Sequence, residues 1–156
     1  MKSSTSTTRY LFKVNLKRAK GIWRKLAMRG DETLDDLHNS IFDAFDRYDP
    51  HLYSFFFPKA PSRGSRSGPR PKEYTAPSMF DEPDLFGDED RFNAADTRLD
   101  DLRLKVRQRF EYLFDFGDSW WHEVTVETIA PVSPNARYGI VERKGVSPAQ
   151  YEEFDE

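Results

Sequence analysis

The sequence contains no cysteine, and this absence removes several classes of site at once. Disulfide scaffolds, thiolate zinc sites and cysteine nucleophiles are all excluded. No apolar run approaches the roughly 20 residues that a membrane-spanning helix requires, and the N-terminal residues lack the apolar stretch of a secretory signal. We therefore expect a soluble, cytoplasmic protein without a membrane partner.

The chain also lacks the short motifs that mark common catalytic sites. It has no P-loop, no GxGxxG, HExxH or GxSxG motif, and no EF-hand loop. The DFG string at 115–117 resembles the kinase magnesium motif, but the catalytic loop and lysine-bearing strand of a kinase do not precede it. The sequence thus favours a non-enzymatic protein, predicts no cofactor, and assigns no nucleophile.

Aromatic residues, by contrast, are abundant. They make up 15% of the 156 residues, which argues against a wholly disordered chain. The length suits one domain with one hydrophobic core. We expect this domain to span 9–151, after a flexible N-terminus at 1–8 and before an acidic tail at 152–156.

Hydrophobic periodicity predicts an α+β fold. A helix is expected at 34–48, where apolar residues recur at helical spacing after a capping-box-like start formed by Thr33 and Asp36. We infer a mostly antiparallel sheet of about five strands, with the helix packed on one face. Alternating apolar residues place these strands at 9–17, 22–29, 51–57, 110–116 and 122–127, and 138–142 is a candidate for a further short strand.

A long proline-rich insertion separates the two halves of this pattern. Six prolines lie between positions 58 and 96, and the segment shows no periodicity. It is far longer than a typical loop, and such segments are usually functional or disordered. We expect residues 58–96 to be flexible and to lack regular structure.

The last two long strands are predicted to form a hairpin with a tight turn. We expect Gly117 to adopt a positive φ there, and the side chain of Asp118 or Ser119 to bind the turn amides. Trp120 and Trp121 follow the turn and must point to opposite faces of the strand. We expect one of them in the core and the other exposed.

Several segments together resemble the plasmid pRiA4b Orf3-like family, also described as passenger proteins of insertion elements. The resemblance covers 9–151 apart from most of the insertion. It implies an α+β fold and a mobile-element context, but no established activity. Many members continue into a Cys- and Pro-rich segment that this chain does not have, so no role of that segment is carried over. The segments that carry the resemblance are WRKL (23–26), TLDDLHNSIFDAF (33–45), HLYSF (51–55), TRLDDL (97–102) and YLFDFGDSWWHEVTVE (112–127).

Basic residues gather at the start of the chain. Residues 1–30 carry nine Lys or Arg and no acid, and Trp23 lies among them. Cations interleaved with aromatic groups are typical of a surface that binds nucleic acid. The acidic helix could instead neutralise this block, because the overall pI is about 5.7. If nucleic acid binds, the expected phosphate contacts are Lys13, Lys17, Arg18, Lys20, Arg24 and Lys25.

A second candidate site combines histidines with carboxylates. Neutral imidazole and carboxylate suit a divalent metal, and His38, His122 and Asp118 are the candidate ligands. No pair of them has close metal-ligand spacing, so each histidine also has a structural reading as a partly buried, hydrogen-bonded residue. Asp115 and Asp118 likewise have a turn-capping reading. The candidate pocket comprises His38, Asp115, Asp118, Trp120 and His122.

Three functions therefore remain open at the level of sequence. The first is a binding or interaction module for nucleic acid or for another mobile-element protein. The second is a metal-dependent hydrolase with a site near His38, Asp118 and His122. The third is a protein–protein adaptor that uses Trp120 or Trp121 together with the 58–96 insertion.

Overall fold

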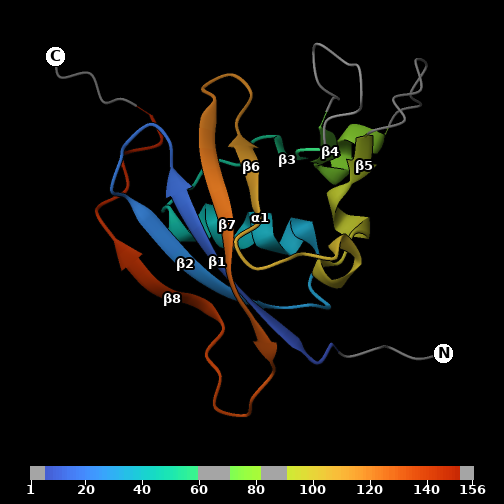
Figure 1. Ribbon diagram of the computed structural model, residues 1–156. Helices are drawn as coiled ribbons and strands as arrows, with labels where there is room; N and C mark the ends of the chain where they lie inside the picture. Colours follow the sequence, from blue (N-terminus) through green and yellow to red (C-terminus); the bar gives the residue numbers. More distant parts are fainter. Residues whose placement is uncertain (1–5, 60–70, 82–90, 152–156) are drawn as a thin grey trace, which may run out of the picture.

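The computed structural model describes residues 6–59, 71–81 and 91–151. Within them, eight strands form one sheet in the order β5-β4-β3-β6-β7-β1-β2-β8, and one α-helix, α1, lies across it (Figure 1). Neighbouring strands are antiparallel, except for β4 and β5, which are parallel. The expected α+β class is confirmed.

The elements have the following bounds. Three short 3-10 helices lie at Pro77–Phe80, Ala94–Asp96 and Leu99–Leu102. The α-helix is α1 (Leu34–Ala44), and the strands are β1 (Thr8–Leu16), β2 (Trp23–Arg29), β3 (Tyr53–Phe57), β4 (Lys72–Thr75), β5 (Arg91–Asn93), β6 (Arg109–Phe114), β7 (Trp120–Pro131) and β8 (Gly139–Lys144).

The core lies between α1 and the face of the sheet that it covers. In β1, Phe12 and Val14 are fully buried there, and Leu37 of α1 is buried against the same core. Aromatic rings fill much of the space, as where Phe57 stacks on Phe110 with ring centroids 4.2 Å apart. Each fully buried side chain of this kind contributes about 1.5–3 kcal/mol, so the high aromatic content is used largely in the core.

The start of α1 matches the expectation, whereas its end does not. The Asp36 amide donates to Thr33 Oγ1 at 3.1 Å and the Thr33 amide donates to Asp36 Oδ2 at 2.9 Å, which forms the capping box. The helix ends at Ala44 rather than at 48. Asp46 adopts a left-handed φ of 57°, and the Arg47 amide donates to the Phe42 carbonyl, as in a Schellman motif.

The number of strands and the character of the insertion also differ from the expectation. The sheet has eight strands rather than about five, and β4 and β5 lie within the proline-rich segment. The 58–96 segment therefore contains regular structure, because β4 pairs with β3 and β5 pairs with β4 without any hydrophobic periodicity of their own. The expected flexibility falls partly on 60–70 and 82–90, which lie outside the described residues, as do residues 1–5 and the acidic tail at 152–156.

The β6–β7 hairpin is confirmed, but its turn is built differently. Positive φ values occur at Asp115 and Ser119, and Gly117 is not among the residues with positive φ. The Asp115 carboxylate, rather than that of Asp118, accepts from the amides of Gly117 at 3.0 Å and Asp118 at 3.3 Å. Asp115 therefore caps the turn, because its left-handed backbone places its own side chain over these amides.

None of the helices in the described part of the chain is long and apolar enough to cross a membrane.

Candidate functional site

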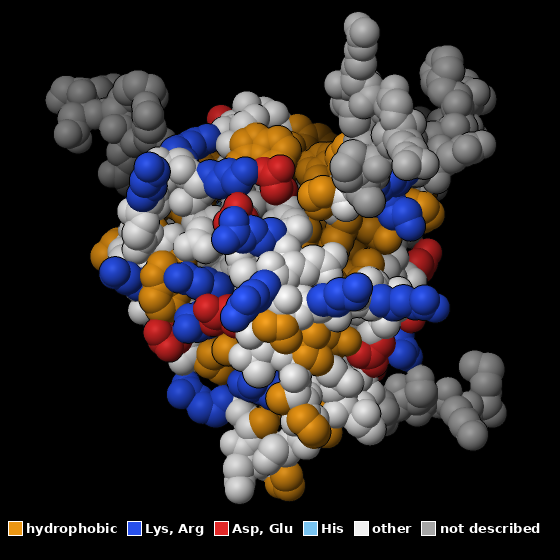
Figure 2. Space-filling view, viewed as in Figure 1, with side chains coloured by type: hydrophobic (Ala, Val, Ile, Leu, Met, Phe, Trp, Pro, Cys, Tyr) orange, Lys and Arg blue, Asp and Glu red, His pale blue; other side chains and the backbone are white. Residues whose placement is uncertain are grey.

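One face of the sheet packs on α1, and the opposite face is exposed to solvent. Strand alternation places Lys13, Trp23, Lys25, Arg109 and Trp121 on this opposite side, which we call the open face. Figure 2 shows this face, on which Lys and Arg side chains gather over β1, β2 and β7. Other members from β6, β7 and β1 are Glu111, Leu113, Glu123, Thr125, Glu127, Arg9, Leu11 and Asn15.

Strand register aligns three cations across the open face. Arg109 lies opposite Thr125, Thr125 opposite Lys13, and Lys13 opposite Lys25. Opposed side chains on adjacent strands have Cβ atoms about 4.5–5.5 Å apart, so like charges in this position destabilise the sheet. Lys25 is compensated by Glu127, at 3.0 Å. Among the residues that the structure describes, Lys13 and Arg109 form no ion pair, so this row keeps a net positive charge.

Two tryptophans lie on the open face, both on the same side of this row of cations. The ammonium groups of Lys13 and Lys25 lie 4.9 and 5.4 Å from the centroid of the Trp23 ring. Farther along the open face, the Trp121 ring lies 5.6 Å from that of Phe56 on β3. Both tryptophans are partly exposed. The open face therefore combines cations with aromatic surfaces on which flat groups can stack.

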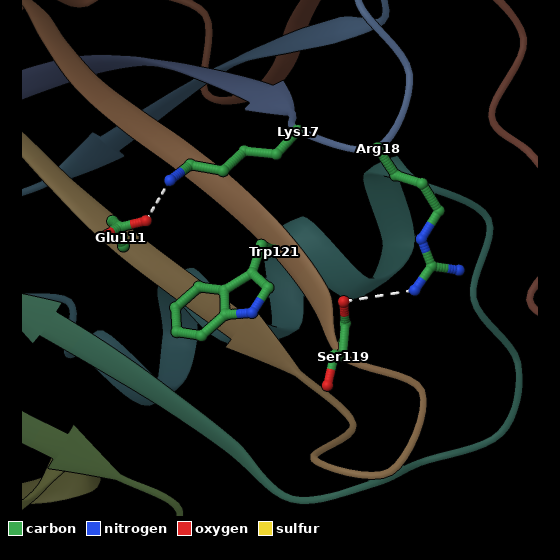
Figure 3. Close-up of a pocket in the computed structure, with 5 residues that line it drawn as sticks. All are labelled: Lys17, Arg18, Glu111, Ser119 and Trp121. Atoms are coloured by element: carbon green, nitrogen blue, oxygen red, sulfur yellow. Dashed lines mark hydrogen bonds and ion pairs between the residues drawn. The ribbon is translucent and has the colours of Figure 1, made fainter.

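A pocket of about 480 Å³ lies at one end of the open face, where the β1–β2 and β6–β7 turns meet. Its lining residues are Lys17, Arg18, Glu111, Ser119 and Trp121 (Figure 3). Lys17 pairs with Glu111 across the Trp121 side chain, and Arg18 donates to the Ser119 carbonyl at 3.2 Å. The pocket thus offers an aromatic surface, a carboxylate and two cations to a small group.

The structure places most of the expected phosphate contacts on the surface. Lys13 and Lys25 lie on the open face, Lys17 is exposed at its pocket, and Lys20 is exposed in the β1–β2 turn. Arg18 is exposed too, but its guanidinium lies 3.8 Å from the Trp120 ring centroid and donates to turn carbonyls. It is therefore held in place by the protein itself.

Arg24 was expected to contact phosphate, but its side chain points into the core. Only 2% of its surface is exposed. Its Nε donates to the carbonyl of Ala44 at 2.8 Å, and its Nη1 donates to the carbonyls of Trp23 and Lys144 at 2.9 and 3.0 Å. A cation at the carboxyl end of α1 also interacts favourably with the helix dipole. Arg24 is thus a structural residue and makes no phosphate contact.

The histidines of the candidate pocket lie on the core face, where both contact Tyr112. His38 stacks on Tyr53 with ring centroids 3.7 Å apart, and its Nδ1 lies 2.6 Å from the Tyr112 hydroxyl. Burial lowers the pKa of His38 to about 3. Burial, and next the charge of Arg47, lower the pKa of His122 to about 3 as well. Both histidines are therefore neutral near pH 7, in agreement with their structural reading.

Trp120 and His122 share a polar cluster with Arg47, a residue that the sequence did not single out. The Arg47 guanidinium lies 4.1 Å from the Trp120 ring centroid, and its Nη1 donates to the Pro148 carbonyl at 3.1 Å. Burial lowers the pKa of Arg47 to about 10, so the group stays charged near neutral pH. Arg47 Nε and Nη2, Trp120 Nε1 and His122 Nε2 are buried without a hydrogen-bond partner among the described residues.

The carboxylates of the candidate pocket do not join the histidines. Asp118 is exposed in the β6–β7 turn, whereas Asp115 is buried and caps that turn. In the described ranges, no group of three or more His, Asp or Glu side chains is arranged to hold a metal ion. His38, His122 and Asp118 are thus not brought together as a ligand set.

The family of this chain is identified by its similarity to known proteins. The sequence profile of the plasmid pRiA4b ORF-3-like proteins matches residues 8–152. The chain belongs to this family. The resemblance noted in the sequence is thereby confirmed over nearly the whole chain.

The fold of this pRiA4b ORF-3-like chain is also found in a crystal structure. That structure is of a protein of unknown function from Methanosarcina mazei Go1, with a TM-score of 0.71 and 22% identity. The similarity covers 94% of this chain and 74% of the other. No curated protein matches the chain. At this identity the similarity concerns the fold alone.

The sequence did not indicate that Arg109 belongs to the open face of this family member, nor that Glu123 pairs with Glu111. Arg109 lies outside the N-terminal basic block, so a sum of charge by segment did not connect it with Lys13. Glu123 lies opposite Glu111, and only strand register reveals that pair. Alternation had already placed both strands, so pairing them in register was the one signal that could have found these residues.

Proposed function

We propose that this protein is a binding module for single-stranded nucleic acid and that the open face is its contact surface. One observation carries the proposal: Arg109, Lys13 and Lys25 are aligned in one register row, with Trp23 beside the two lysines. Proteins that bind single strands combine a positive groove for the backbone with aromatic side chains on which bases stack.

The electrostatics of the row favour a phosphate ligand. Lys13 and Lys25 face each other directly, and a phosphate between them would relieve their repulsion. Glu127 compensates Lys25, while Arg109 and Lys13 have no ion pair among the described residues. The negative overall charge of −3 does not oppose this, because binding depends on the local charge of the surface, and several Lys and Arg side chains lie on the face that Figure 2 shows.

The aromatic groups favour a single strand over a duplex. Trp121 and Phe56 present ring surfaces toward the open side of the sheet, and Trp23 lies at the other end of the same face. The bases of a duplex are stacked on one another, whereas those of a single strand can be splayed onto such rings. With such a ligand we propose a cytoplasmic location, and the ligand suits a family named after a plasmid reading frame.

The test is fluorescence-anisotropy binding to single-stranded DNA and RNA across a salt series. We expect a log-affinity slope of about −3 or steeper against log salt, as for release of several counterions. Lys13→Gln should reduce the slope by about one unit. Lys72→Gln is the matched control, since Lys72 is exposed but lies opposite the core residue Phe57. No binding at low salt, or equal effects of the two variants, would refute the proposal.

A second variant separates stacking from charge. Trp121→Ala should lower the affinity for single strands about tenfold at every salt concentration, because one stacked base contributes roughly 1–3 kcal/mol. The slope of the salt dependence should stay as it is in the wild type. A change of slope without a uniform loss of affinity would show that Trp121 does not stack on a base.

A further inference from the structure

The pocket at the end of the open face contains a carboxylate where a purely phosphate-binding surface would have none. Glu111 lines this pocket beside Trp121, and it lies directly opposite Glu123 on β7. Two carboxylates in this position repel each other, which costs the sheet stability. Lys17 compensates Glu111, whereas Glu123 forms no ion pair among the described residues. Hydrogen-bond donors from a ligand would relieve the repulsion between Glu111 and Glu123.

The same register row continues with other polar and aromatic groups. Asn15 lies opposite Glu123, and Trp23 lies opposite Asn15. On the other side, Phe56 lies opposite Glu111. The row thus presents hydrogen-bond acceptors between two aromatic ends, next to the row of cations that would hold phosphates. Side chains in this arrangement are suited to the edges of unpaired bases.

We infer that the pocket recognises guanine, with the base stacked on Trp121 and its Watson–Crick edge on the Glu111 carboxylate. This inference rests on the proposed function. A carboxylate has two acceptor oxygens side by side, and guanine presents two adjacent donors, N1–H and N2–H2, on this edge. The pocket volume of about 480 Å³ lies within the range of small-molecule sites.

The other bases fit this carboxylate less well. Adenine and cytosine each place an amino group beside a ring nitrogen lone pair, which would face a carboxylate oxygen. Uracil and thymine present a single N–H between two carbonyl oxygens. Each of these edges leaves one oxygen of Glu111 facing an acceptor, and an unmatched polar contact of this kind discriminates against the ligand.

Lys17 completes the recognition of a nucleotide. When the base edge takes the place of the Lys17 ammonium at Glu111, that ammonium is free to contact the phosphate of the same nucleotide. Arg18 lies on the opposite side of the pocket, next to Ser119 (Figure 3). Lys17 therefore supplies the phosphate contact beside the base, whereas Arg18, held by Trp120 and the turn carbonyls, forms the opposite wall of the pocket.

The experiment compares three seven-nucleotide RNAs: all-uridine, uridine with one central guanosine, and uridine with one central inosine. Inosine keeps the N1–H donor but lacks the N2 amino group. We expect about tenfold tighter binding for guanosine than for uridine, with inosine between them. Glu111→Gln should reduce the ratio of guanosine to uridine affinity to twofold or less. Glu142→Gln, the same change on β8 opposite Lys25, should leave the ratio unchanged.

The possible outcomes separate this inference from the proposed function. Binding of all three RNAs with equal affinity would overturn the guanine site and leave the nucleic-acid module intact. A guanosine preference that survives Glu111→Gln would overturn the role of Glu111. Absence of binding to every RNA would overturn both. The ratio of guanosine to uridine affinity is used because removing the negative charge of Glu111 should strengthen the binding of all three RNAs alike and so leave the ratio unaffected.

Discussion

Arg24 and Lys25 are neighbours in β2, yet they lie on opposite faces of the sheet. The guanidinium of Arg24 is buried and donates to three carbonyl oxygens, one of them at the end of α1. The ammonium of Lys25 lies on the open face, near Glu127 and Trp23. The core face thus uses a cation to hold the chain together, whereas the cation on the open face lies at the surface in an ion pair.

The same division applies to the tryptophans and the acidic residues. Trp120 is 3% exposed and its ring lies 4.1 Å from the Arg47 guanidinium, whereas Trp121 lines the pocket on the other face. Asp115 is committed to turn amides, whereas Glu111 is held only by a surface ion pair. Residue type alone therefore does not identify a binding residue in this fold, because the strand face decides its role.

The largest expected effect is on the free energy of unfolding when each of the two neighbouring cations, Arg24 and Lys25, is replaced by methionine. Arg24→Met should lower the free energy of unfolding by about 3 kcal/mol or more, because it leaves buried carbonyls without their charged donor. Lys25→Met should change it by less than about 1 kcal/mol, as for a surface ion pair. Urea unfolding of both variants measures the difference. Equal losses would contradict the division between the faces.

The next largest effect is the pH dependence of the free energy of unfolding that results from the burial of His122. Its pKa is lowered to about 3 in the folded protein, and that of an unfolded chain is near 6.5, so the unfolded state binds more protons between these values. The stability due to neutral His122 is complete above pH 6.5 and falls as the pH decreases. At pH 4.5 the loss should be about 2–3 kcal/mol.

Urea unfolding at pH 7 and pH 4.5 checks this prediction. The variant His122→Leu serves as the reference, since it removes the titrating group but keeps an apolar side chain against Phe45. The wild type should lose more stability on acidification than this variant. Parallel losses in the two proteins would show that His122 does not resist protonation in the folded state.

The smallest effect is expected on the open face itself. Lys17 and Glu111 pair with side chains that are 44% and 40% exposed. Lys17→Gln should change the free energy of unfolding by no more than about 0.5 kcal/mol, since exposed pairs of this kind contribute little. A loss of several kcal/mol in a denaturant titration would assign Lys17 to the framework of the fold and remove it from the binding surface.

Local patterns predicted much of the sheet. Alternation located β1, β2, β6 and β7, and the Thr33–Asp36 capping box located the start of α1. The end of α1 was missed because Asp46, rather than a glycine, takes the left-handed position. Strands β4 and β5 were missed because they are short and depend on pairing with β3 and with each other.

The candidate site was only partly predictable, for a related physical reason. Charge density identified Lys13, Lys17 and Lys25, but it could not show that Arg24 faces inward. The partners of Arg24 come from the end of α1 and from β8, which are distant in sequence. Likewise, Arg109 joins the row of cations only through the register of three strand pairs.

The position of β1 in the sheet has a consequence for synthesis of the chain. This strand comes first, but it lies between β2 and β7, and Leu16 is paired with His122, 106 residues later. At about 5–20 residues per second, a ribosome needs roughly 5–20 s to make that interval. During this time β1 has β2 as a partner but still exposes its other edge. We expect the nascent chain to depend on chaperones until β7 emerges and closes the centre of the sheet.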